Sequence, residues 1–210
     1  MTVPKFALFE HRLDETYNEN LRKLPEMVKA LRLSNSLDEG DLKKIKKDVY
    51  DDFASKYDFN DFKITTSDIS VQNQEFSFEK SVAADILGPN LTSNLTSDFV
   101  TLYYALYTVP YSGNIESLKY TTVHPKEEVY LADHGNYFAL TVYSLYPVKE
   151  SAEAIKHEKD RVLDLITKNH DANATYIKNK ESHLKDAIDK EIDLNFKSAR
   201  NEIRDNDALL

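Results

Sequence analysis

The sequence predicts an α+β fold, with N-terminal helices, a central antiparallel β-sheet and a long C-terminal amphipathic helix or helical hairpin. Apolar residues recur at helical spacing in the first third of the 210 residues and with a period of two in the middle third. The remainder, 148–210, contains neither glycine nor proline. We therefore expect residues 1–147 to form a helical N-terminus with a sheet domain, and residues 148–210 to form a long helical, coiled-coil-like extension.

Two amphipathic stretches lie in the first third of the chain. Their apolar side chains are three or four residues apart, at Leu13, Tyr17, Leu21 and Leu24 and at Leu42, Ile45, Val49, Phe53 and Tyr57. Pro25 suits the first turn of a short helix between them. Ser36 and Glu39 have the spacing of a capping box, which predicts the start of the second stretch.

Alternating apolar residues predict the strands of the sheet. Large side chains on both faces of 100–109 indicate a central strand, and 136–148 has the same character. A short strand lies between them, within 127–135. The segment VQNQEF, 71–76, predicts a hairpin turn, and 88–98 predicts a polar loop. Together these segments predict an antiparallel sheet of about five or six strands.

The C-terminal extension has apolar residues at spacings of three, four and seven. An unbroken helix of this length would reach about 80 Å, so we expect it to fold back near NHDANAT or to bury its apolar stripe against another chain. Asn169 and Asn173 give that stripe a polar centre. We expect a homo-oligomer, and the candidate oligomerisation residues are Asn169, Asn173, Tyr176, Leu184, Ile188 and Ile192.

Composition argues against several function classes. The chain has no cysteine, which excludes thiolate chemistry, and its four glycines are scattered, which excludes a glycine-rich phosphate loop. We expect no cofactor and no metal site, although His124 and His134 could converge with Asp133 or Glu128. An enzyme is therefore not favoured.

Charge and hydropathy limit the partners. The net charge of −9 disfavours nucleic acid, because the average surface repels phosphates. The sequence lacks both a long apolar run and a secretory leader, so we expect a cytoplasmic protein without a membrane span.

Tyrosine is abundant around the predicted sheet, and aromatic sheets can form recognition surfaces. The segment PYSGNIESLKY, 110–120, follows the central strand, and we interpret it as a turn in which Gly113 supplies backbone freedom. A protein partner could dock at the rim of the sheet. The candidate partner-binding residues are Tyr103, Tyr107, Tyr111, Asn114, Lys119, Tyr120 and His124.

The stretch from 99 to 210 is similar to the N-terminal region of bacterial anti-phage defence proteins that carry a C-terminal TIR or nuclease effector domain. The similarity lies in Tyr111-Ser112-Gly113-Asn114, in Leu118-Lys119-Tyr120 followed by TTVHP, and in the Asn-rich helical segment after them. It implies a non-catalytic domain that senses a protein or ligand partner, self-associates through its C-terminal helices and regulates a linked effector.

Two alternatives remain open at this point. One is a small metal-dependent nuclease that uses Asp61 and Lys63, which have the acid-x-Lys spacing of a Mg²⁺ site. The other is a stand-alone structural protein that assembles through its helices.

Overall fold

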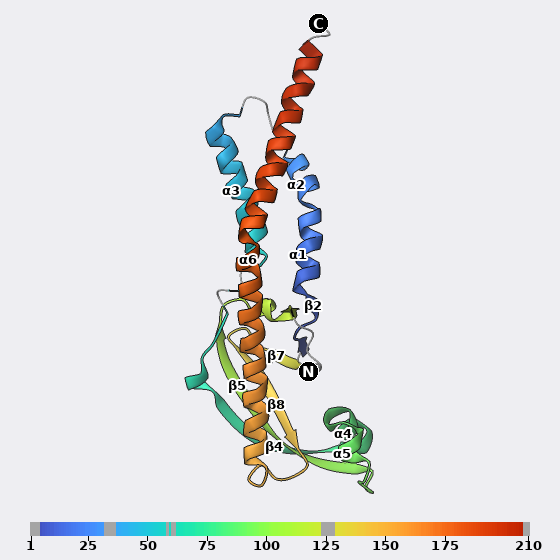
Figure 1. The fold of residues 1–210 in the computed structure, drawn as a ribbon. Helices are drawn as coiled ribbons and strands as arrows, with labels where there is room; N and C mark the ends of the chain where they lie inside the picture. Colours follow the sequence, from blue (N-terminus) through green and yellow to red (C-terminus); the bar gives the residue numbers. More distant parts are fainter. Residues whose placement is uncertain (1–4, 32–36, 58, 60–61, 123–128, 208–210) are drawn as a thin grey trace. The chain divides into compact units, whose positions relative to one another are not determined.

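The computed structural model describes residues 5–31, 37–57, 59, 62–122 and 129–207 (Figure 1). The chain forms two compact units, each assembled from three separate stretches. The first unit, called the sheet unit below, draws on 1–10, 61–119 and 125–169, and the second, called the helical unit, draws on 11–60, 120–124 and 170–210. This division differs from the expected boundary after residue 147, because the long C-terminal helix contributes residues to both units.

The sheet unit is built on an antiparallel sheet, which with the helical elements confirms the predicted α+β class. In the described part of the chain the sheet has six strands in the order β1-β7-β8-β5-β3, and β4 also pairs with β5. The strands are β1 (Lys5–Ala7), β3 (Lys63–Ile64), β4 (Ser70–Glu79), β5 (Phe99–Ser112), β7 (Tyr130–Asp133) and β8 (Tyr137–Ser144). Its helical segments are η1 (Thr66–Asp68), α4 (Lys80–Leu87), α5 (Pro89–Thr92) and η2 (Ile115–Lys119).

The two faces of β5 are covered at different places along the strand. Val100 and Leu102 pack with Ala83 of α4. Further along, Ala105 and Val109 pack with residues of helix α6 (Ala152–Asp207), among them Ile166. Because successive side chains of a strand point to opposite faces, α4 and α6 cover opposite faces of the sheet. This arrangement explains why β5 carries large side chains at both even and odd positions.

The helical unit packs three short helices around the later part of α6, as Figure 1 shows. These are α1 (Leu13–Arg22), α2 (Leu24–Ala30) and α3 (Glu39–Ser55), and a short parallel pair of β2 (His11–Arg12) and β6 (Tyr120–Thr121) lies in the same unit. The predicted apolar faces pack into the core of this unit, although Leu21, Leu42 and Ile45 are only partly buried. The core consists of Leu13, Tyr17, Leu24, Val28, Val49, Phe53, Tyr57, Phe59, Leu184, Ile188 and Ile192.

The C-terminal helix is a single element. α6 runs without interruption through NHDANAT, so the prediction of one long helix is confirmed and the hairpin alternative is wrong. Without glycine or proline, nothing in the sequence interrupts its backbone hydrogen bonds. Ion pairs four residues apart, such as Asp164 with Lys168 and Glu181 with Lys185, support the exposed face.

Three local predictions are corrected. The hairpin turn at 71–76 is wrong, because β4 passes straight through it and pairs with β5 along its whole length. Residues 80–87, for which no element was predicted, form α4, and the polar loop 88–98 begins with the short helix α5. The capping box of α3 is made by Asp38 and Asp41, whose side chains each accept the other's backbone N–H, while Ser36 lies outside the described residues.

Candidate functional site

The helical unit contains a groove of about 620 Å³. Volumes of this size accommodate a small-molecule ligand or a few side chains of a partner. We call it the tyrosine groove. It is lined by Tyr17, Tyr50, Asp51, Phe53, Ala54, Ser55, Tyr57, Phe59, Ala174, Thr175, Ile177, Lys178, Glu181 and Leu184.

The aromatic floor follows from helical spacing. Tyr50 and Phe53 are three residues apart in the last turns of α3 and so share one face, and Tyr57, two residues after the helix ends, packs on Phe53 with ring centroids 5.5 Å apart. Tyr17 of α1 meets two of them, with ring centroids 5.5 Å from Phe53 in an edge-on arrangement and 5.5 Å from Tyr57. Edge-on and tilted pairs are the favoured geometries for aromatic rings, so the floor is a packed cluster.

Hydroxyl groups fix this cluster in place. Asn20 Nδ2 donates to Tyr57 Oη at 2.5 Å, and the Tyr57 hydroxyl lies 3.3 Å from the carbonyl oxygen of Thr16. The end of α3 is thereby tied to α1. Burial raises the pKa of Tyr17 to about 12, so its hydroxyl stays protonated at neutral pH.

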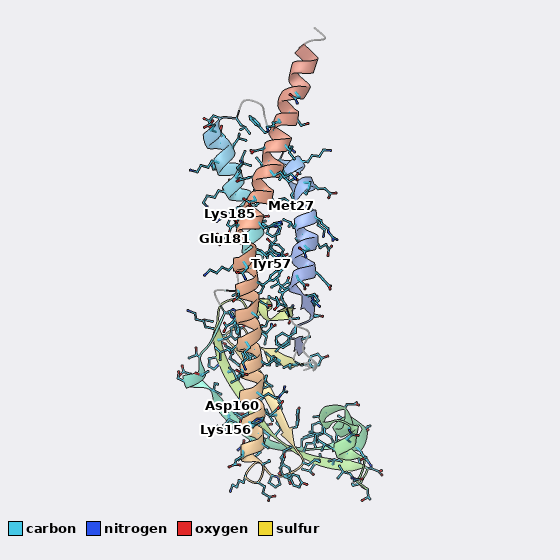
Figure 2. All side chains as sticks on the ribbon, in the orientation of Figure 1. Met27, Tyr57, Lys156, Asp160, Glu181 and Lys185 are labelled. Carbon is cyan, nitrogen blue, oxygen red and sulfur yellow. The ribbon has the colours of Figure 1, made fainter. Side chains whose placement is uncertain are left out.

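The rim of the groove is charged. Asp51, Lys178 and Glu181 line it around the aromatic floor. Glu181 accepts from Lys185 Nζ at 2.5 Å, and this hydrogen bond is the main reason that the pKa of Glu181 lies below its usual value. Lys185 in turn lies 5.0 Å from the centre of the Tyr50 ring. Figure 2 labels Glu181 and Lys185 one helical turn apart on α6, and Tyr57.

One wall of the groove is α6, and α3 is held against it by polar contacts as well as apolar ones. Lys46 Nζ lies 2.9 Å from Asp193 Oδ1 and 3.4 Å from Asp189 Oδ1. The hydrogen bond to Asp193 is the main cause of the raised pKa of Lys46. The groove therefore lies between two helices with a defined register. Its shape suits a ligand with an aromatic or aliphatic body and polar ends. Among the described residues that line it, there is no histidine and no buried pair of carboxylates, the groups that acid–base catalysis would use.

The predicted oligomerisation residues lie mostly inside this unit. Leu184, Ile188 and Ile192 are buried against α1, α2 and α3 of the same chain. Their apolar pattern is thus explained within one chain and gives no separate indication of a second chain. Tyr176 packs its ring edge-on to Tyr17, with centroids 6.0 Å apart. Asn169 belongs to the sheet unit by sequence position.

Asn173 is the most buried polar side chain of α6, with 0% of its surface exposed. Its Nδ2 donates to the carbonyl oxygen of Tyr120 at 2.8 Å. No donor among the described residues reaches its Oδ1. A half-satisfied buried amide costs stability, and in helical cores such groups fix register. Asn173 anchors the segment 120–122 to α6 within the helical unit.

The predicted partner-binding residues are divided between the two units. Tyr103, Tyr107, Tyr111, Asn114 and Lys119 belong to the sheet unit and Tyr120 to the helical unit, while His124 lies outside the described residues.

Tyr107 and Tyr111 occupy the packed face of β5. Lys159 Nζ of α6 lies 5.8 Å from the centre of the Tyr107 ring. Tyr111 is buried and donates its hydroxyl to Asp133 Oδ1 at 2.8 Å, and burial with this bond raises its pKa to about 12. Both residues therefore contribute to the core beneath α6. After them, Gly113 has φ +88°, the conformation that the predicted turn requires.

The residues considered for metal chemistry are only partly within the described ranges. Asp61, His124 and Glu128 lie outside the described residues, and Lys63 is an exposed residue of β3. His134 stacks on Tyr137, with ring centroids 4.7 Å apart. In the part of the chain that the structure describes, no three His, Asp or Glu side chains gather as a metal site.

Comparisons with known proteins give no further assignment. No protein-family model matches the chain, and neither the curated proteins nor the solved structures contain a match. Within the described ranges, no helix combines the length and the apolar character needed to cross a membrane.

The tyrosine groove itself was not predicted. The sequence assigned Tyr17, Phe53 and Tyr57 to apolar helix faces, which is where they lie. The available signal was the concentration of aromatic residues at the end of α3, Tyr50, Phe53 and Tyr57, followed directly by Phe59. The helices that enclose these rings could not be predicted from the sequence.

Proposed function

We propose that this chain is a non-catalytic sensing module, which binds a ligand or a partner segment in the tyrosine groove and couples binding to its sheet unit through α6. The observation that carries the proposal is the shared use of one helix. α6 lines the groove with residues such as Ile177, Lys178 and Glu181, and it also contributes Ile155 and Ile166 to the core on the sheet.

A ligand could act on the sheet unit by contacting one conformation of the chain better than another. A bound molecule changes a conformational equilibrium only as far as it contacts one state better than another. A ligand in the groove would contact α6 directly. Because the backbone hydrogen bonds of α6 are continuous, a shift or stiffening of the helix at the groove would also reach the part of the helix that packs on the sheet. The aromatic floor supplies apolar surface for the ligand body, and Asp51, Lys178 and Glu181 supply polar contacts at the rim.

The absence of cysteine provides a direct test. In Lys178→Cys the new thiol lies on the groove rim and can be labelled with N-phenylmaleimide, which places an aromatic ring at the groove. Ser182→Cys, at an exposed position of α6 outside the groove lining, is the matched control. Hydrogen–deuterium exchange is then compared for 152–169 and for β5.

We expect the label at position 178, and not the label at 182, to change exchange in both segments of the sheet unit. If the change stops within the helical unit, or if both labels act alike, the coupling is contradicted.

A narrower form of the proposal follows the resemblance noted for residues 99–210. In that form the module regulates a linked TIR or nuclease effector in anti-phage defence and self-associates through α6. Because Leu184, Ile188 and Ile192 are buried within the chain, self-association would use exposed positions such as Leu194, which is 52% exposed. Light scattering over a concentration series tests this, since a strict monomer, or an assembly unchanged by Leu194→Glu, contradicts it.

A further inference from the structure

β4 is an open edge of the sheet in the described part of the chain. It pairs with β5 along all ten residues, and no other described strand pairs with it. Nine of its side chains are exposed, and Phe78 is partly buried. Figure 1 shows β4 alongside β5 at the margin of the sheet. Backbone N–H and C=O groups that point away from β5 are therefore available to another strand.

This edge lacks the usual protection. Proteins block exposed edges with short strands, lysine, proline or a β-bulge. β4 has ten residues and contains no lysine or proline. Its register against β5 is continuous, from Ser70 opposite Thr108 to Glu79 opposite Phe99, which leaves no bulge. Its charged residues are Glu75 and Glu79, which would repel an acidic strand and attract a basic one.

The two faces of β4 differ in chemistry. Phe76, 60% exposed, lies 5.1 Å from Phe78 between ring centroids, and Phe78 lies 6.5 Å from Tyr143 of β8. The opposite face carries Glu75 and Glu79, which are four residues and so roughly 13 Å apart along the strand. A strand added at this edge would meet apolar rings on one face and two carboxylates on the other.

We propose that β4 accepts an extended segment of a partner protein by strand addition. The segment carries apolar side chains on the face of Phe76 and Phe78, and lysine or arginine on the face of Glu75 and Glu79. The chain's net charge of −9 also attracts a basic segment. This site lies in the sheet unit, and it does not depend on the tyrosine groove of the helical unit.

Charge also argues against a second copy as the occupant. In a two-fold antiparallel pairing of β4 centred on Glu75, the two copies of Glu75 lie directly opposite each other. When the pairing is centred on Gln74 they become diagonal neighbours. Like charges in these positions destabilise a strand pair, so a basic segment fits the edge better than the same acidic strand.

A peptide experiment tests the proposal. The probe is a ten-residue, end-capped peptide in which threonine alternates with valine, and lysine replaces threonine at the first and fifth positions, which face Glu79 and Glu75 in full antiparallel register. A second peptide carries glutamate at the same two positions. Binding is followed by amide chemical shifts and hydrogen exchange of the native chain. We expect the lysine peptide to bind, with protection of amides within β4, and the glutamate peptide to bind at least about tenfold more weakly.

A charge reversal in the protein provides the reciprocal test. Glu75→Lys with Glu79→Lys should weaken binding of the lysine peptide roughly tenfold, because two attractive cross-strand pairs become repulsive. The matched control, Glu150→Lys with Glu153→Lys, makes the same change in net charge at exposed positions of the same unit and should leave affinity within about twofold.

Several results would overturn the proposal. They are equal binding of the two peptides, shifts that lie outside β4 and its neighbours, and no binding at millimolar peptide. Protection of residues 70–79 that grows with protein concentration in the absence of peptide would assign the edge to a second copy instead. If the charge-reversed variant does not fold, the difference in affinity between the two peptides for the native chain still tests the proposal.

Discussion

The two units use the same helix in different ways. In the sheet unit, α6 lies on strands, and Ile155, Val162 and Ile166 meet side chains that alternate along β5 and β8. In the helical unit, α6 meets helices, and Leu184, Ile188 and Ile192 meet residues three and four apart on α1 and α3. One regular apolar stripe can therefore serve two kinds of partner, since a helix face does not specify what covers it.

Both units bury polar groups, but at different places. In the sheet unit, the Tyr111 hydroxyl reaches Asp133, while the buried Ser117 hydroxyl of η2 has no partner among the described residues. In the helical unit, the amide of Asn173 is only partly satisfied by described residues. Asn173 lies on α6 itself, where a buried amide can specify the register of the helix.

The largest expected effect tests whether the apolar stripe of α6 contributes equally to stability in the sheet unit and in the helical unit. Ile166→Ala in the sheet unit and Ile188→Ala in the helical unit each remove a side chain with at most 1% exposure. Each should lower the free energy of unfolding by about 2–5 kcal/mol through lost burial and a new cavity. Urea denaturation followed by circular dichroism measures this. Leu194→Ala, at an exposed position of the same helix, should cost less than about 0.5 kcal/mol, and similar losses for all three would contradict the assigned cores.

Asn173 provides the next test of the contrast. Asn173→Ala removes the hydrogen bond to the Tyr120 carbonyl and leaves a cavity, so it should cost about 1–3 kcal/mol in the same assay. Asn173→Leu keeps the volume and removes the half-satisfied amide, so it should cost less than alanine. The control is Asn179→Ala, at an exposed position one to two turns further along. If leucine proves the more damaging substitution, the amide is better satisfied than this account holds.

The dependence of stability on alkaline pH allows one buried tyrosine from each unit to be compared. The pKa values of Tyr17 and Tyr111 are raised to about 12, mainly by burial. The folded state therefore holds these protons more tightly than the unfolded state, whose tyrosines titrate near 10. This stabilisation is complete below about pH 10 and is lost as the pH rises toward 12. Tyr17→Phe and Tyr111→Phe should each flatten the fall in melting temperature over that window, and unchanged slopes would contradict the assigned burial.

The smallest expected effect concerns a helix terminus. Asp38 caps α3 by accepting from the Asp41 N–H at 2.8 Å. Asp38→Ala should lower the free energy of unfolding by about 1 kcal/mol. Asp48→Ala, in the exposed middle of α3, is the control, and equal losses would show that charge rather than capping is responsible.

Much of the fold could be predicted from the sequence, because its strongest signals are periodic. β5 and β8 were found by alternation, and α1 to α3 by helical spacing. Part of β4, 71–76, was interpreted as a hairpin turn, because Gln72, Asn73 and Gln74 are polar and both faces of the strand are exposed. α4 was missed because its short apolar run, SVAADIL, is compatible with either a strand or a helix.

The sites were less predictable for a physical reason. Tyr107 and Tyr111 are aromatic residues on a strand, which the sequence cannot distinguish as core or surface without knowing that α6 covers that face. The oligomerisation stripe was read correctly as buried, but its cover is α1 to α3 rather than a second chain. In both cases the missing information is a long-range contact, and no local pattern records it.

The most direct test of the central claim is hydrogen exchange along α6 in the native chain, resolved for single amides. Coupling through α6 requires one continuous helix through residues 169–173, where the apolar stripe becomes polar. We therefore expect amides in this segment to be protected to a degree comparable with those around Ile166 and Leu184. Fast exchange confined to 169–173, with protected segments on both sides, would contradict it, because two separate helices could not couple the groove to the sheet.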